Sequence, residues 1–162
     1  MLKLDHIEKY FWRGSAREIH ALKNISLSIE KGEYVVIVGS NGSGKSTLLN
    51  ALAGTISVDS GQILVDGKNV SQTRADNRSR YISRVFQDPS AGTASDLSVL
   101  ENFRLASLRT DAKKSRIGTD SSFRKKISEI ISVLGLVLED HLDQPMGKLS
   151  GGQRQEIGRA HV

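Results

Sequence analysis

One segment of the chain combines glycines, hydroxyl side chains and a lysine at fixed spacing. It reads Gly39, Ser40, Asn41, Gly42, Ser43, Gly44, Lys45, Ser46 and Thr47. The spacing matches G-x-x-x-x-G-K-[ST], the phosphate-binding loop or P-loop. Glycines at 42 and 44 let the backbone curl around an anion, because they tolerate positive φ and have no Cβ. Inward N–H groups and the positive end of the following helix would then bind phosphate oxygens.

The side chains of this loop suggest a division of roles. Lys45 is expected to reach the β- and γ-phosphates of a nucleotide, and the Ser46 hydroxyl to take one position on Mg²⁺. Thr47 is placed to hydrogen-bond the α-phosphate. The competing interpretation is a Gly/Ser-rich turn that fits the pattern by chance. A strand before the loop and a helix after it favour the nucleotide site.

The flanking residues supply this context. Residues 34–38 are a β-branched apolar run that predicts a buried parallel strand. Residues 46–53 predict a helix that buries its leucines and ends at Gly54. Further strands are predicted over residues 2–9, 24–30, 62–65 and 81–86, with a tight hairpin turn at Asp66 and Gly67. Helices are predicted over residues 97–108 and 123–134, separated by a surface loop over 110–122 and with Gly135 as the second C-cap.

Composition and charge exclude several classes of protein but do not identify one. The chain has 162 residues, a net charge of +5 and no cysteine, which excludes disulfides and thiolate metal sites. No apolar run approaches the roughly 20 residues of a membrane span, and no signal peptide opens the chain, so a cytoplasmic protein is expected. The basic stretches at 113–116 and 124–126 lack interleaved aromatic residues. A solvated surface is therefore the favoured interpretation over a nucleic-acid site.

A second motif follows about a hundred residues after the P-loop. Leu149 is followed by Ser150, Gly151, Gly152 and Gln153, a turn that resembles an anion-binding nest at a helix N-terminus. Alone, such a turn is a weak signal and favours a plain loop. Gln87 lies between the two motifs at the end of a predicted strand, followed by Asp88 and Pro89.

In this order, the P-loop, the Gln-Asp-Pro turn and the Leu-Ser-Gly-Gly-Gln pentapeptide resemble the ATP-binding subunit of an ABC transporter. The resemblance spans residues 1–155. It implies an α/β fold, with a P-loop core and antiparallel β subdomain over 1–96 and a helical subdomain over 97–150. It also implies ATP and Mg²⁺ as cofactors, a transmembrane permease as partner, and a cytoplasmic position on the inner face of the membrane. A substrate-binding protein is a further implied partner, and no nucleic acid is expected.

The same resemblance assigns roles outside the P-loop. Gln87 would touch Mg²⁺ or the attacking water. Phe11 would stack on adenine, with Tyr10 and Trp12 as alternatives and core packing as the competing role. Ser150, Gly151, Gly152 and Gln153 are signature residues that would contact the nucleotide held by a second subunit. Two copies would then sandwich two ATP molecules.

Some residue patterns point to a narrower subgroup. The sequences at 41–43, 86–89, 91–94 and 146–148 resemble importer-type members that act beside permeases for tryptophan- or tyrosine-like substrates. Alternatives are an ABC-class ATPase without a permease, acting on ribosomes or DNA, and an ATP-binding module that does not hydrolyse ATP.

The chain also departs from the family pattern. Members of the family continue after the signature to an apolar strand ending in Asp-Glu and then a switch histidine, and neither occurs here. The four histidines (His6, His20, His141 and His161) lie at the wrong places for that role. Poor hydrolysis and marginal folding are therefore expected of this chain alone. Residues 156–162 lack the apolar helical pattern expected after the signature and match the translation of a sequencing-library adapter, so a non-native tail is expected.

Overall fold

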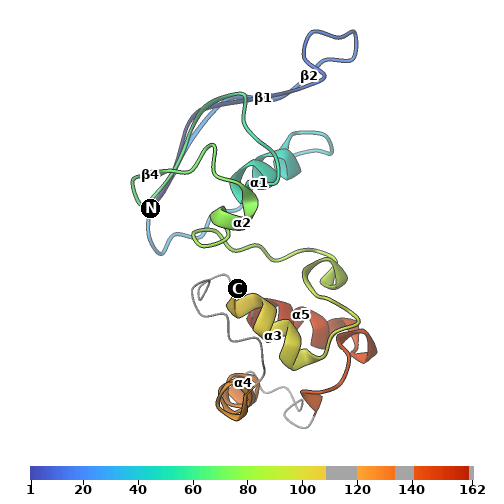
Figure 1. Ribbon diagram of the computed structural model, residues 1–162. Coiled ribbons are helices and arrows are strands. Elements are labelled where there is room, and N and C mark those ends of the chain that lie inside the picture. The colour runs from blue at the N-terminus through green and yellow to red at the C-terminus, as the bar shows by residue number, and fades with distance from the viewer. Residues whose placement is uncertain (109–119, 134–140, 161–162) are drawn as a thin grey trace. The chain divides into compact units, whose positions relative to one another are not determined.

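The computed structural model describes residues 1–108, 120–133 and 141–160. The chain divides into two compact units, Met1–Ile82 and Ser83–Val162, and each unit has its own hydrophobic core. The segments are coloured by residue number in Figure 1. Residues 110–119 of the predicted surface loop over 110–122 lie outside the described residues, as do Leu134 and Gly135, whereas residues 121 and 122 already belong to a helix.

The first unit is built on an antiparallel sheet of four strands in the order β2-β1-β3-β4. The strands are β1 (Leu2–Phe11), β2 (Ile19–Ile29), β3 (Ser60–Val65) and β4 (Lys68–Asn69). Figure 1 shows β1 and β2 running side by side. Asp66 and Gly67 connect β3 to β4 with φ angles of 48° and 77°, the left-handed conformation of a tight hairpin. The predicted antiparallel β subdomain and its turn are therefore confirmed.

Helix α1 (Lys45–Ala53) supplies the other half of this core. The buried residues of the unit come from the sheet, from α1 and from the segments beside them: Leu4, Ile7, Leu22, Leu48, Ala51, Val58, Ile63 and Val70. The helix ends at Gly54, which has a φ of 76° and donates its N–H to the last turn. The predicted helix and its glycine C-cap are therefore confirmed.

Two predicted strands are absent from the structure. Residues 34–38 form no regular secondary structure, and Tyr34 and Val38 are 91% and 83% exposed. Residues 82–86 are likewise irregular, after a turn at Tyr81. A strand needs a neighbour for its backbone N–H and C=O groups, and no strand of the described residues pairs with either segment. The apolar β-branched pattern indicated strand propensity, which without a partner does not produce a strand.

Arg78, at the end of the short helix α2 (Ala75–Arg78), joins α1 to the sheet. Its side chain is buried, and its guanidinium donates to the carbonyl groups of Ala51 and Leu52 in α1. It also donates to the carbonyls that follow β4, at Val70, Ser71 and Thr73. Burial lowers the pKa of Arg78. The cation lies at the negative end of the α1 dipole, so the carbonyl oxygens compensate its charge without a carboxylate partner.

The second unit is helical within its described residues. Its elements are the 3₁₀ turns η1 (Pro89–Gly92) and η3 (Met146–Lys148) and the helices α3 (Val99–Ser107), α4 (Ser121–Val133) and α5 (Gly151–Ala160). Its core consists of apolar side chains from these helices and from the segment before η3: Val99, Leu100, Phe103, Ile127, Ile131, Leu142, Met146, Leu149 and Ile157. The helical subdomain expected from the resemblance is present.

The ends of two helices differ from what the sequence indicated. The helix predicted over residues 97–108 is shorter in the structure, since α3 covers Val99–Ser107 and Leu108 is 45% exposed. Residues 156–160, whose sequence lacks the apolar pattern expected after the signature, nevertheless continue α5 to Ala160, and Ile157 is completely buried. The non-native origin of residues 156–162 stays a prediction.

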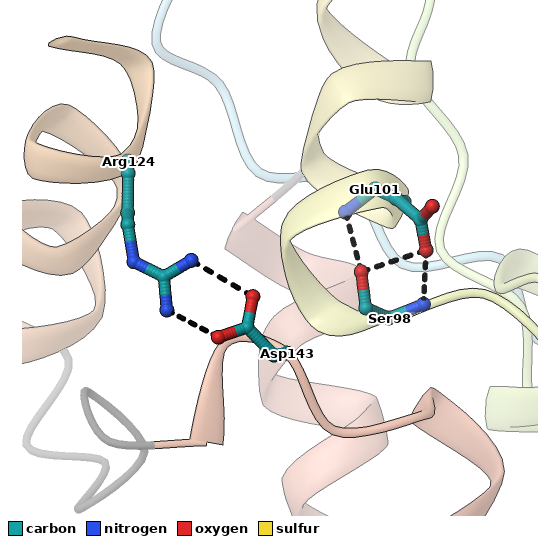
Figure 2. A network of polar contacts seen from close by, with 4 residues as sticks. All are labelled: Ser98, Glu101, Arg124 and Asp143. Atoms are coloured by element: carbon teal, nitrogen blue, oxygen red, sulfur yellow. Dashed lines mark hydrogen bonds and ion pairs between the residues drawn. The ribbon is translucent and has the colours of Figure 1, made fainter. Parts of the chain in front are cut away.

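Polar contacts fix the start of α3, as Figure 2 shows. Ser98 accepts a hydrogen bond from the Glu101 N–H at 3.2 Å, and the Glu101 carboxylate accepts one from the Ser98 N–H at 2.7 Å. The N–H groups of Val99 and Leu100 donate to backbone carbonyls of residues 144 and 142. The first three N–H groups of the helix therefore all have acceptors.

The segment after residue 140 is also held to α4. Arg124 on α4 donates to both carboxylate oxygens of Asp143 in a bidentate pair (Figure 2). This contact lowers the pKa of Asp143 and raises the pKa of Arg124, chiefly through the hydrogen bonds. Lys125 and Lys126 beside it are exposed. The basic stretch at 124–126 therefore lies on a solvated surface, while 113–116 falls outside the described residues.

Replacing Arg78 tests its role in joining α1 to the sheet. Arg78→Met keeps the apolar stem and removes every hydrogen bond, so we expect the free energy of unfolding to fall by about 2–4 kcal/mol. Chemical denaturation followed by circular dichroism measures this change. Arg80→Met removes an exposed cation two residues away and serves as the control. Equal stability of the two variants would contradict the role given to Arg78.

The Glu101 contact predicts a pH dependence of stability. Hydrogen bonds from the Ser98 N–H and hydroxyl lower the pKa of Glu101 below its ordinary value of 4.5. The folded state therefore favours the ionised carboxylate, and its extra stability is present above pH 4.5 and lost as the pH falls through the lowered pKa. Glu101→Gln keeps an acceptor for Ser98 without a charge. We expect wild type to be more stable than this variant at pH 7, and the difference to shrink on acidification. A difference that does not change with pH would refute this account.

Candidate nucleotide-binding site

The P-loop backbone is curled by its glycines. Gly42 and Gly44 have φ angles of 80° and 87°, and the Ser43 N–H donates to the Ser40 carbonyl at 3.3 Å. The positive φ values predicted for these glycines are therefore present. A Cβ at Gly44 would lie 2.6 Å from the carbonyl oxygen of Ala21, so no side chain fits where the loop passes strand β2. Glycine is thus required at this position by both conformation and space.

Lys45 folds back over this loop. Its Nζ donates to the carbonyl oxygens of Gly39 and Ser40 at 2.7 Å each, and to the Ser43 hydroxyl at 3.2 Å. Within the first turn of α1 there is no acidic residue and no side-chain cap. The positive end of the helix and the ammonium group therefore lie at the same loop without an anionic side chain beside them. This arrangement suits a phosphate group.

A pocket of about 600 Å³ adjoins the P-loop. The loop and α1 contribute Gly42, Ser43, Gly44 and Thr47 to its lining, and the sheet contributes Phe11, Trp12, His20 and Lys23 among others. Aromatic side chains and residues of the P-loop therefore line the same cavity. A nucleotide has the same two chemical parts, a flat apolar base and a charged phosphate chain.

The structure separates the three aromatic candidates near the start of the chain. Phe11 and Trp12 line the pocket, whereas Tyr10 is not part of its lining. The Tyr10 ring instead stacks on His20 with centroids 4.0 Å apart, and the Arg13 guanidinium lies 4.7 Å from its centre. Phe11 is partly buried and Trp12 is 65% exposed. Phe11 and Trp12 both remain candidates for stacking on a base.

Sequence reasoning missed the polar residues that β2 contributes to the pocket. His20 and Lys23 line the cavity from β2, which begins at Ile19 and not at residue 24 as predicted. In the sequence analysis, His20 was considered only for the role of switch histidine and was excluded from that role. Strand pairing could have identified His20. Because β2 pairs with β1 in antiparallel register as far as Phe11, β2 must begin at Ile19, the residue opposite Phe11.

Gln87 and the signature residues lie in the second unit. Gln87 is exposed at a bend before η1. The next residue, Asp88, accepts hydrogen bonds from the side chain and N–H of Ser90 at 2.7 and 2.8 Å. These bonds, with a smaller contribution from the charge of Arg154 in α5, lower the pKa of Asp88. The carboxylate therefore stays ionised at neutral pH and fixes the turn that follows Gln87.

The signature residues form the start of α5. The Ser150 N–H donates to the Gln153 side-chain oxygen at 3.0 Å, and the Gln153 N–H donates to the Ser150 hydroxyl oxygen at 3.3 Å. This is a capping box. Gly151 and Gly152 are exposed, and a Cβ at either would meet nothing within 4 Å. The N-terminus of this helix is therefore ordered and open to solvent.

The structure thus brings together the P-loop residues with Phe11 in the first unit, and the signature residues on one helix in the second. Among the described residues, no cluster of three histidine or acidic side chains forms a protein-only metal site. Mg²⁺ commonly binds with one or two protein ligands and the phosphates of its nucleotide, and the exposed Ser46 beside Lys45 fits that ligand type. In the part of the chain that the structure describes, no helix is long and apolar enough to cross a membrane.

Comparisons with curated proteins identify relatives of this chain. The chain is 38% identical over 160 residues to a tyrosine transport ATP-binding protein of Clostridioides difficile, covering 97% of this chain and 62% of that protein. It is 33% identical to a probable branched-chain amino acid transport ATP-binding protein of Methanocaldococcus jannaschii, covering 99% of this chain and 63% of that protein. The chain therefore spans about three fifths of the length of these curated relatives.

Solved structures give the same result. An ATP-binding cassette, solved as a dimer in a post-hydrolysis state with ADP and Pi, matches with a TM-score of 0.77 and 30% identity over 99% of this chain and 68% of that one. A Clostridium perfringens protein, described as part of the ABC transporter complex cbiONQ, matches with a TM-score of 0.73 and 29% identity over 99% and 59% of the two chains. The family model described as "ABC transporter" matches residues 22–162. On these grounds the chain belongs to the ABC transporter family, as an ATP-binding cassette.

Proposed function

We propose that this chain binds ATP with Mg²⁺ at the P-loop, as the nucleotide-binding part of a transporter ATPase. The observation that carries the proposal is the shared cavity, which the P-loop lines at one side and Phe11 and Trp12 line at another. The base would stack on one of these rings while the phosphates enter the curled loop. The family membership supports the same ligand.

The groups in the loop have distinct roles in this proposal. Lys45 exchanges its bonds to the loop carbonyls for bonds to the β- and γ-phosphates, and Thr47 meets the α-phosphate from the pocket side. Ser46 holds Mg²⁺, which when bound neutralises charge on the phosphates. Gln87 contacts Mg²⁺ or the attacking water when the complete site assembles. Lys45 and Gln87 are therefore the residues proposed to act in hydrolysis.

A second copy of the protein would complete each site. Ser150, Gly151, Gly152 and Gln153 lie at an open helix N-terminus, where a phosphate held by another subunit can approach. A similar cassette has been solved as a dimer with ADP and Pi. We therefore propose a homodimer that sandwiches two ATP molecules between P-loop and signature.

The relatives support a role in transport. Proteins similar to this chain are named as transport ATP-binding proteins, among them one for tyrosine. We propose that the whole protein couples ATP hydrolysis to import of an aromatic amino-acid-like substrate, through a permease and with a substrate-binding protein. It would then lie on the cytoplasmic face of the membrane. Among the described residues, no observation favours a permease-free role on ribosomes or DNA.

Replacing Lys45 tests nucleotide binding. Lys45→Ala removes the cation that the loop holds, so we expect the affinity for Mg-ATP to fall about 30-fold or more. Titration with a fluorescent ATP analogue, displaced by ATP, measures this loss. Lys3→Ala removes an exposed lysine of β1 and is the matched control. Retention of full affinity by Lys45→Ala would exclude the P-loop as the phosphate site.

Hydrolysis by these 162 residues alone is proposed to be negligible. The only acidic side chain after Gln153 is Glu156, and no Asp-Glu pair follows an apolar strand there. Positioning and charge stabilisation supply most of the catalysis in phosphoryl transfer, so binding without turnover is the expected result. Phosphate release should be no faster than for Lys45→Ala under the same conditions. Release that depends on Lys45 would show that the chain supplies its own catalytic groups.

A further inference from the structure

His20 occupies a defined place in the wall of the nucleotide pocket. It lines the cavity from β2, and its side chain is 28% exposed. Tyr10 covers one face of the imidazole ring, with the two rings stacked 13° from parallel. Glu8 on β1, whose side chain is 25% exposed, hydrogen-bonds the ring at Nε2. Two neighbours on β1 therefore hold the ring in one orientation.

Glu8 also decides which ring nitrogen carries the proton. An ionised carboxylate only accepts hydrogen bonds, so the neutral imidazole bonded to it must carry its hydrogen on Nε2. The other Glu8 oxygen accepts the Asn24 N–H at 3.0 Å, which fixes the carboxylate. Among the described residues, Nδ1 of His20 has no hydrogen-bond partner. It is left as an acceptor on a residue that lines the pocket.

An acceptor at this place distinguishes the two common purines. Adenine carries an amino group at position 6, which donates, whereas guanine carries a carbonyl oxygen there, which accepts. We propose that His20, held by Glu8, is a specificity-determining residue that accepts a hydrogen bond from the adenine amino group and disfavours guanine. This inference rests on the proposed binding of a nucleoside triphosphate at the P-loop and names the base that the same site selects.

Glu8→Gln provides a test based on the proton position. The Gln side-chain oxygen can still accept from the Asn24 N–H, while its amide nitrogen donates to Nε2 of His20. The imidazole hydrogen then moves to Nδ1, and the acceptor at the pocket becomes a donor. A donor suits the carbonyl at position 6 of guanine. The variant should therefore bind GTP more tightly than ATP, the reverse of wild type.

The experiment measures the affinities of the 162-residue chain for ATP, GTP and purine riboside triphosphate, which lacks any group at position 6. For wild type we expect ATP to bind about tenfold more tightly than GTP, with the purine analogue between them. His20→Phe keeps a flat ring to stack on Tyr10 and removes the acceptor, so the ATP-to-GTP ratio should fall to about one. His6→Asn alters another histidine of the sheet, which bonds Asp5 outside the pocket lining, and should leave the ratio unchanged.

The possible outcomes separate this inference from the function on which it rests. If wild type binds none of the three triphosphates, the proposed function fails. If it binds ATP and GTP equally, the P-loop proposal stands and base selection by His20 is wrong. An ATP preference that survives in both His20→Phe and Glu8→Gln would also overturn the inference. Equal losses of ATP and GTP affinity in His20→Phe would leave the ratio unchanged and would likewise overturn the inference.

Discussion

The buried guanidinium of Arg78 determines where the P-loop helix can lie in its unit. It binds the last carbonyls of α1 and the carbonyls that follow β4, so a single cation joins the helix to the sheet. The approach is so close that a Cβ at Gly54 would lie 2.9 Å from Nε of Arg78. At the other end of α1, Gly44 passes the Ala21 carbonyl with no room for a side chain. The helix is therefore fixed at both ends by contacts that only glycine permits.

This fixation explains how the site is held although residues 34–38 form no strand. The residues of the candidate phosphate site belong to the first turn of α1 and to the loop before it, and α1 packs on the antiparallel sheet. The aromatic side of the pocket comes from β1 and β2 of that same sheet. Both sides of the candidate site are therefore positioned by one hydrophobic core. The exposed segment 34–38 contributes no residue to the buried core of this unit.

The sequence predicted those features that depend on local chemistry. The P-loop spacing, the glycine cap at Gly54 and the Asp66–Gly67 hairpin are conformations that a few adjacent residues dictate, and all are present. The strands predicted over residues 34–38 and 81–86 are absent, because a strand forms only when a partner strand, which can be distant in sequence, pairs with it. The burial of Arg78 has no signal in the sequence, because it is the carbonyl groups brought around the guanidinium that make this burial favourable.

In the candidate site, too, features set by adjacent residues were predicted and features set by distant residues were not. The P-loop was proposed from the spacing of its residues, but setting Tyr10 apart from Phe11 and Trp12 required the pocket lining and the stacking of Tyr10 on His20. His20 itself was missed because its surroundings come from β1, which lies 12 residues away at Glu8. Pocket walls built by cross-strand pairs depend on register, and register is set by the whole hairpin and not by a motif.

The signature helix combines local order with free hydrogen-bonding capacity. In the capping box, Ser150 accepts through its hydroxyl oxygen and Gln153 accepts through its side-chain oxygen. A hydroxyl that accepts still has its own hydrogen to donate, and an amide that accepts through oxygen still has two N–H groups. Both side chains are therefore held in place by bonds that leave their donors for an anion. With the glycines between them open, the start of α5 can receive a phosphate without first breaking its own cap.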